Sequence, residues 1–217
     1  MRSHIVVALA ALIVGALTDD ALPEAPNTLA SPKSFASIAD TDRRSVALFT
    51  ELGKVLTHPR CVNCHPAGDR PRQGDLGRLH QPPVERGPDG HGLPGAQCAT
   101  CHGKANPPDS YGAHQPPGVP TDWHLPRPGM TLVFVGRSPQ ALCEQLKDPA
   151  RNGNLSLAAL LKHVSSDPLV LWGWKPGFGR KPVAVPHAEF VAAFQRWVDA
   201  GAPCPAEQTA DVSRRTR

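Results

Sequence analysis

Aromatic residues and methionine are scarce in this chain of 217 residues, which has six Phe, four Trp, one Tyr and two Met. By contrast it has 25 Pro and 19 Gly, which interrupt long helices and central strands alike. Such a chain would struggle to offset its ordering entropy by burying its own side chains. We therefore expect short helices, much irregular chain and a core that a bound apolar group completes.

A concentration of charge of one sign is also absent. The formal net charge is +4, without the clustered Lys and Arg stripe that is typical of nucleic-acid binders. We therefore expect no nucleic-acid partner, and the mild positive charge favours docking on an acidic protein surface.

Long apolar runs are lacking except at the N-terminus. A positive start precedes an uninterrupted run of apolar and small residues from Ile5 to Leu17, which is long enough for a signal-peptide core and too short to span a bilayer. We predict a signal peptide over residues 1–22, cut at Ala16 or near Ala25, and hence a periplasmic or otherwise exported protein. An uncleaved anchor helix is the alternative. Because no later segment is apolar enough, we expect a soluble protein with no stable membrane span after signal cleavage.

Two copies of one pattern stand out against this background. Residues 61–65 read Cys-Val-Asn-Cys-His and residues 98–102 read Cys-Ala-Thr-Cys-His. Cys-x-x-Cys-His is the attachment signature of c-type haem, in which two thioethers hold the macrocycle and the His is the proximal iron ligand. The sequence therefore predicts two covalently bound haem c groups. Their predicted attachment and proximal residues are Cys61, Cys64, His65, Cys98, Cys101 and His102.

Other cysteine chemistry gives competing interpretations of the two motifs. Two Cys-x-x-Cys pairs could form a four-thiolate zinc site, but such a site has no use for a His after each pair. Disulfides and a thioredoxin-like redox pair are further alternatives, although no strand-then-helix pattern surrounds either motif. Haem remains the favoured interpretation.

The spacing of the motifs favours one shared fold. They begin 37 residues apart, at Cys61 and Cys98, which leaves too little chain for a complete monohaem domain between them. Because Met1 leaves with the signal peptide, Met130 is the methionine of the mature chain, and at most one haem can have His/Met ligation. Met130, His80 and His91 are the leading candidates for distal ligands. The further candidate histidines are His114, His124 and His163.

Several other side chains have possible roles beside a haem. Arginine binds carboxylates in a bidentate fork, so one or two of the loop arginines could hold propionates, although surface solvation explains most arginines equally well. The loop arginines are Arg70, Arg72, Arg78 and Arg86. Four aromatic residues could pack against macrocycle edges or simply form core: Trp123, Trp172, Trp174 and Phe178.

The pattern along the chain predicts a mainly α protein with extensive irregular coil and little or no sheet. We expect a linker over 23–40, a single dihaem domain over 41–204 and a disordered tail over 205–217. Within the domain, 41–130 would bind the haems and 131–204 would be helical. The apolar spacing predicts helices from Thr41 to before Pro59, from Pro139 through Leu146, over 155–164 with Asn154 as cap, and over about 188–200. Residues 66–97 show neither helical nor strand periodicity.

The two remaining cysteines are Cys143 and Cys204. Their even number and the expected exported location predict a disulfide between them, which would tie the first helix of the C-terminal part to the end of the last.

These motifs resemble those of dihaem c-type cytochromes, and the segment Trp197-Val198-Asp199-Ala200-Gly201-Ala202-Pro203-Cys204 is similar to the end of many bacterial cytochrome c-like domains. The whole mature chain, including residues 58–65 and 146–153, also resembles bacterial proteins labelled isoquinoline 1-oxidoreductase subunits. The first resemblance implies a compact cytochrome c-like fold with short helices around two haems. The second implies an electron-accepting partner role for a molybdenum hydroxylase, although the chain shows no molybdopterin or flavin signature.

We therefore expect a one-electron carrier between a dehydrogenase or other oxidoreductase and a downstream cytochrome or oxidase. In this interpretation the chain is an electron-transfer protein or subunit, and no catalytic residues are assigned. The alternatives are a dihaem peroxidase-like enzyme with one open haem site and a haem-based sensor.

Overall fold

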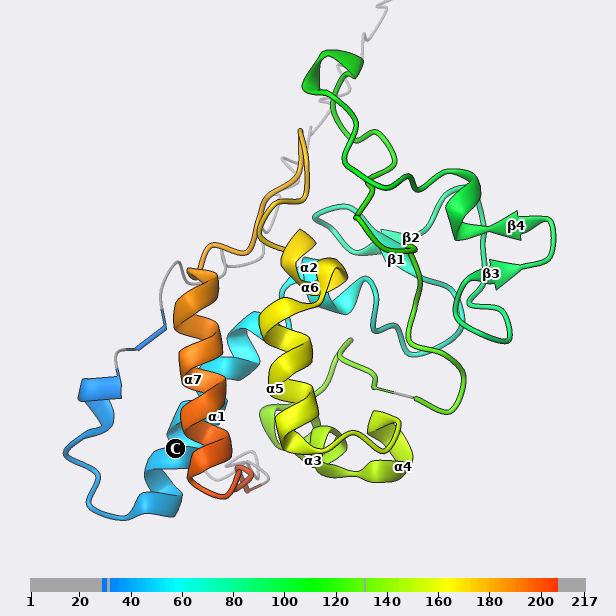
Figure 1. The fold of residues 1–217 in the computed structure, drawn as a ribbon. Helices are drawn as coiled ribbons and strands as arrows, with labels where there is room; N and C mark the ends of the chain where they lie inside the picture. Colours follow the sequence, from blue (N-terminus) through cyan, green and yellow to red (C-terminus); the bar gives the residue numbers. More distant parts are fainter. Residues whose placement is uncertain (1–28, 31, 131, 207–217) are drawn as a thin grey trace, which may run out of the picture.

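A computed structural model describes residues 29–30, 32–130 and 132–206 of the chain (Figure 1). The described chain is mainly helical with little sheet, as the sequence predicts. Its helices are α1 (Thr41–Leu56), α2 (Pro59–Val62), α3 (Pro139–Lys147), α4 (Pro149–Asn152), α5 (Leu157–Ser166), α6 (Pro168–Trp172) and α7 (His187–Asp199). Its 3₁₀ turns are η1 (Pro32–Phe35), η2 (Cys98–Thr100) and η3 (Asp109–Tyr111), and its strands are β1 (Arg72–Gln73), β2 (Arg78–Leu79), β3 (Gly92–Leu93) and β4 (Ala96–Gln97).

Helix α1 forms where the sequence predicts it. The Asp40 carboxylate caps its first turn by accepting a 2.7 Å hydrogen bond from the Arg43 amide. Apolar residues at helical spacing, including Leu48, Phe49 and Leu52, are buried on one face. The helix ends at Leu56, before Pro59, so both predicted boundaries are confirmed.

The C-terminal helices also follow local signals, with one correction. Helix α3 begins after the Ser138 cap, and α7 covers the predicted range within one residue at each end. The predicted cap of the middle helix, Asn154, is wrong: Asn154 has a left-handed φ of 62°. The Ser156 side chain caps α5 instead, by accepting from the Ala159 amide, so this helix starts two residues later than expected.

A side-chain core holds these helices together. Helix α1 packs against α7 and α3, and α7 also packs against α5. The Phe49 and Trp197 rings lie at the centre, fully buried, with centroids 4.8 Å apart. The core residues come from two segments, 29–62 and 132–204. The helices of these segments thus form a core of side chains although the chain is poor in aromatic residues.

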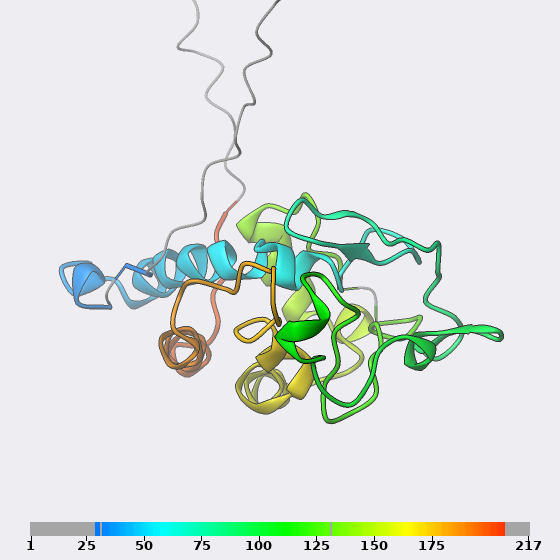
Figure 2. The same cartoon turned by 90° about the horizontal axis from the view of Figure 1, so that it is seen from above.

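The stretch between the motifs forms two small hairpins in otherwise irregular chain. Strand β1 pairs with β2 and β3 with β4, each antiparallel and two residues long. The sequence showed no periodicity here because such short strands are set by their turns, in which Gly74, Gly77 and Gly95 have positive φ. We call residues 66–130, which are mostly irregular, the coil-rich part of the chain. In Figures 1 and 2 it lies to one side of the helices.

Part of the predicted linker over 23–40 is folded. It contains η1, and Phe35 packs against the core. The Ala30 amide donates to the Glu51 carboxylate of α1 at 2.9 Å. The predicted signal peptide and residues 207–217 of the predicted tail lie outside the described residues. Within the described ranges, no helix is both long and apolar enough to cross a membrane.

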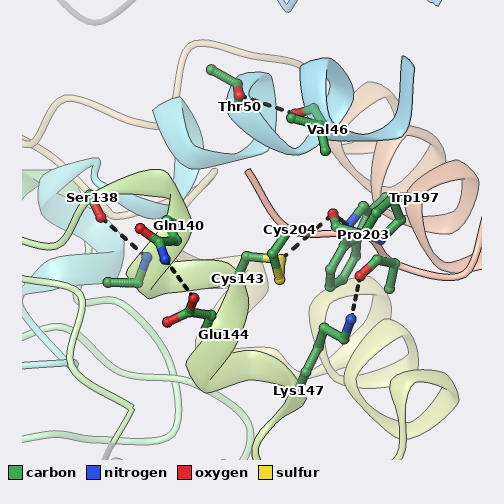
Figure 3. Close-up of a disulfide and its surroundings, with 12 residues drawn as sticks. Val46, Thr50, Ser138, Gln140, Cys143, Glu144, Lys147, Trp197, Pro203 and Cys204 are labelled. Atoms are coloured by element: carbon green, nitrogen blue, oxygen red, sulfur yellow. Dashed lines mark hydrogen bonds between the residues drawn. A yellow bond between two sulfur atoms is a disulfide. The ribbon is translucent and has the colours of Figure 1, made fainter. Parts of the chain in front are cut away.

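The predicted disulfide between Cys143 and Cys204 is present (Figure 3). It joins α3 to the segment after α7, over a sequence separation of 61 residues. Neighbouring bonds hold the same segment: the Trp197 indole N–H donates to the Pro203 carbonyl at 3.0 Å, and the Lys147 ammonium donates to the Ala202 carbonyl at 2.7 Å.

Replacing both cysteines by alanine should lower the free energy of unfolding. A bridge that closes a loop of this length stabilises by about 2–5 kcal/mol, mainly by restricting the unfolded chain. Denaturant unfolding followed by far-UV circular dichroism measures the loss, and wild type in reductant should match the double variant. Equal stability of oxidised wild type and the variant would contradict the prediction.

Candidate functional site

The first Cys-x-x-Cys-His motif lies on a short helix that follows α1 directly. His58 caps α2, because its Nδ1 accepts a 3.1 Å hydrogen bond from the Arg60 amide, and Pro59 occupies the first turn. The helical turn continues beyond α2, with the His65 amide bonded to the Cys61 carbonyl at 3.2 Å. Cys61, Cys64 and His65 are therefore presented by one compact turn.

His65 is held by the start of the helical part of the chain. Its Nδ1 lies 3.0 Å from the Leu132 carbonyl, and its ring stacks on Phe134 with centroids 4.0 Å apart. A carbonyl can only accept, so Nδ1 carries the proton and Nε2 has a free lone pair. Burial lowers the pKa of His65 to about 4, so the ring stays neutral. This is the form in which imidazole binds a metal.

The second motif repeats the arrangement on different supports. Turn η2 follows β4 directly, and the His102 amide bonds to the Cys98 carbonyl at 2.9 Å. His102 Nδ1 lies 2.8 Å from the Pro117 carbonyl, which again leaves Nε2 unprotonated. The His102 ring stacks on Trp123 at 4.5 Å, nearly parallel, and burial lowers its pKa.

A cavity of about 470 Å³ opens beside the first motif; we call it the first cavity. Cys61, Cys64 and His65 line it, and its other walls come from both parts of the chain. The helical part contributes mainly apolar residues, including Leu146, Leu155, Leu160, Trp174 and Phe190. The coil-rich part contributes polar groups, including Asp89, His91, His124 and Arg127.

A second cavity of about 580 Å³ opens beside the second motif. Cys98, Cys101 and His102 line it together with Trp123 and other residues of the coil-rich part. Both volumes fall in the range of about 300–1,000 Å³ that is typical of small-molecule and cofactor sites. Each motif thus has its own cofactor-sized cavity.

Arg60 and Cys64 line both cavities, so the two sites share a wall. The Arg60 side chain is only 1% exposed; it pairs with Asp75 and lies over the Trp172 ring, 5.6 Å from its centroid. Its Nε has no hydrogen-bond partner among the described residues. Burial lowers the pKa of Arg60, and Asp75 opposes this shift. The positive charge of this guanidinium favours an anionic group in the adjoining space.

The predicted distal ligands divide between the cavities. Met130 and His91 line the first cavity, whereas His80 lines the second. Of the further candidates, His124 and His163 line the first cavity and His114 the second. Met130 is packed on Gly153, whose positive φ suits glycine and where a Cβ would lie 2.8 Å from the Met130 Sδ. This close approach holds the thioether at the cavity wall.

The loop arginines have different surroundings. Arg72 and Arg78 line the second cavity, as does Arg180 from the helical part. Arg86 does not line either cavity; it bonds to the Asp69 carboxylate and to the carbonyls of Gly68 and Pro126, which ties the loop together. Arg70 has a buried Nε without a partner in the described chain.

Of the four aromatic residues singled out in the sequence, Trp123 and Trp172 line the second cavity and Trp174 lines the first. The Trp172 indole donates to the Asn106 amide oxygen at 3.1 Å. Phe178 is 52% exposed and lines neither cavity, so core packing of this ring, one of its two expected roles, is wrong.

The four motif cysteines are distributed over the two cavities. Within the described residues, no group of three or more Cys, His, Asp or Glu is placed to hold a metal ion. Burial raises the pKa of Cys61 to about 12 and that of Cys64 to about 11, so both side chains are neutral thiols at neutral pH.

Two residues of the site, Phe134 and Arg60, were not predicted from the sequence. Phe134 lies outside both motifs, and nothing in its local pattern indicates that it stacks on His65. Arg60 directly precedes a motif cysteine, which was an available signal, but its burial between the cavities depends on the packing of α2 against Trp172 and Asp75.

His58 gives a testable pH dependence, because burial and then Arg60 lower its pKa from 6.5 to about 4. The unfolded chain takes up a proton below pH 6.5 that the folded chain refuses, so stability should fall as the pH drops from about 6.5 toward 4, by up to about 1.4 kcal/mol per unit. His58→Asn keeps a capping side chain and should make this loss smaller. Denaturant unfolding over this pH range tests it. The two proteins should differ by a constant amount above pH 7, and a constant difference at every pH would contradict it.

Comparison of the chain with protein-family models, with curated proteins and with solved structures returned no match in any of the three. A function for the two cavities must therefore be argued from their residues and from the motifs that the sequence contains.

Proposed function

We propose that this protein is an exported dihaem c-type cytochrome that transfers single electrons between an oxidoreductase and a downstream acceptor. The observation that carries the proposal is the set of contacts made by the two motif histidines, His65 and His102. Each donates its Nδ1 proton to a backbone carbonyl, stacks on an aromatic ring, lines a cavity and has an unprotonated Nε2. Histidines that bind metals almost always donate their other ring N–H in this way.

The residues around both cavities fit a haem. Each cavity has two free cysteine thiols and one neutral imidazole from its own motif, as covalent attachment and proximal ligation require. Arg60 lies in the wall between the cavities and places a buried positive charge beside both, which supports the fit because haem propionates are carboxylates. Arg72, Arg78 and Arg180 offer further donors at the second cavity.

The chain's own residues would hold, orient and shield the cofactors. Bound haem iron would supply reversible one-electron chemistry. The Leu132 and Pro117 carbonyls fix the ring orientation of His65 and His102, which would be the proximal ligands. The apolar walls of the first cavity exclude water, and a buried, dry site influences a reduction potential. The shared wall supports exchange between two closely placed centres.

The proposed partners are redox proteins: a dehydrogenase as donor and a cytochrome or oxidase as acceptor. The resemblance to isoquinoline 1-oxidoreductase subunits proposes a molybdenum hydroxylase as one donor. The net charge of +4 favours an acidic surface on whichever partner docks. Export to the periplasm is part of the proposal, since the sequence predicts a signal peptide at its N-terminus.

Expression in a cell that has the c-type haem attachment machinery should give a protein with two covalent haems. Cys61→Ala/Cys64→Ala should retain one haem and Cys98→Ala/Cys101→Ala should retain the other, because each pair would hold its own macrocycle. Intact mass and haem absorption count the groups. As a control, Cys143→Ala/Cys204→Ala should retain both haems. A wild-type protein without covalent haem would overturn the proposal, and bound zinc in its place would establish the alternative.

Absorption spectra with carbon monoxide and with peroxide should separate a carrier from an enzyme or sensor. For a carrier we expect two six-coordinate, low-spin haems that bind neither ligand, because both axial positions are filled. A high-spin haem that reacts with peroxide would contradict the carrier and support a peroxidase-like enzyme, and reversible binding of carbon monoxide alone would support a sensor.

A further inference from the structure

We infer that His80 is the distal ligand of a haem iron in the second cavity, so that His80 and His102 together form a bis-imidazole site. This inference rests on the proposed function, because it needs a haem at the second motif. Both rings line the second cavity together with Cys98 and Cys101. His80 therefore lies beside the second motif, and it does not line the first cavity.

The separation of the two rings carries the assignment. Their centroids lie 6.1 Å apart, with an angle of 54° between the planes. Imidazole nitrogens bind metals at about 2 Å, so two such bonds in line, with the distance from each nitrogen to its ring centre added, span roughly 6 Å. A direct hydrogen bond or a ring stack would bring the centroids closer. The gap between His80 and His102 is thus the size that one metal ion between two imidazoles requires.

The hydrogen bonds of the two rings agree with this geometry. His80 Nδ1 lies 2.9 Å from the Pro82 carbonyl, as His102 Nδ1 lies 2.8 Å from the Pro117 carbonyl. Each carbonyl accepts, so each Nδ1 is protonated and the neutral ring has its lone pair on Nε2. His80 therefore has the same backbone anchor as the two motif histidines, although it belongs to no motif.

The backbone of His80 is fixed rather than free. It follows β2 directly, and its amide donates to the Pro71 carbonyl at 3.0 Å, just before β1. The Arg72 amide in turn donates to the Asn63 carbonyl of the first motif at 2.9 Å. The hairpin β1–β2 thus links the first motif to His80 and holds His80 at the second cavity.

The position of methionine makes the two sites unequal. Met130 lines the first cavity, and the other methionine of the sequence is Met1. The second iron therefore has imidazole, and not thioether, available on its distal side. His/Met ligation raises the reduction potential of a haem, so the bis-imidazole site should accept electrons less readily than a site ligated by Met130 would.

The test replaces His80 in the holoprotein and uses His114→Ala as the matched control, since His114 lines the same cavity. His80→Ala should keep two covalent haems but convert one from low to high spin, as seen by electron paramagnetic resonance and resonance Raman spectroscopy. That haem should bind carbon monoxide, and added imidazole should restore the low-spin spectrum. His114→Ala should leave both haems low spin.

A second variant guards against loss of the fold. His80→Met should leave the haem of the second cavity low spin but raise its midpoint potential, since a thioether replaces an imidazole. Two low-spin haems with wild-type potentials in both His80 variants would overturn the inference, and a high-spin haem only in His114→Ala would assign His114 instead. Absence of covalent haem from the wild type would be a different failure, that of the proposed function.

Discussion

The hydrogen bond between His65 Nδ1 and the Leu132 carbonyl joins two parts of the chain that are 67 residues apart. A second bond, from the Phe134 amide to the His65 carbonyl at 3.0 Å, runs beside it. These bonds attach the first motif to the irregular segment that leads into α3. His65, Leu132 and Phe134 all line the first cavity. This connection between the two parts of the chain is therefore part of the cavity wall.

The helical core and the coil-rich part are stabilised in different ways. The core between α1, α3, α5 and α7 buries enough apolar surface to fix the position of α2 at the end of α1. The coil-rich part lacks such a core, and it is instead held by hairpins, by the bonds of Arg86 and by the attachment of its ends to the two motifs. A buried cation, Arg60, lies where the cavities meet. If haems occupy both sites, this charge acts on both, so their electrostatics cannot be independent.

Local signals in the sequence predicted the helices that have strong ones. Asp40 and Ser138 are caps followed by apolar residues at helical spacing, and both helices begin where these residues indicate. Asn154 and Ser156 are equally good caps by type, and backbone conformation chose the second. The hairpins and the short helix α2 gave no periodic signal, because a two-residue strand or a single helical turn is too short to show one.

The sequence by itself determined which groups each site presents, because Cys-x-x-Cys-His places two thiols and an imidazole on one turn whatever surrounds it. It also determined the cysteine pair left for a disulfide and, for the proposed pair of haems, that methionine could serve at most one iron. Only the tertiary structure decided which side chains face which motif: His80 reaches the second cavity, whereas His91 and Met130 reach the first. These residues are distant along the chain from the motif histidines they join, and such proximity depends on hairpin register and helix packing, which no local pattern records.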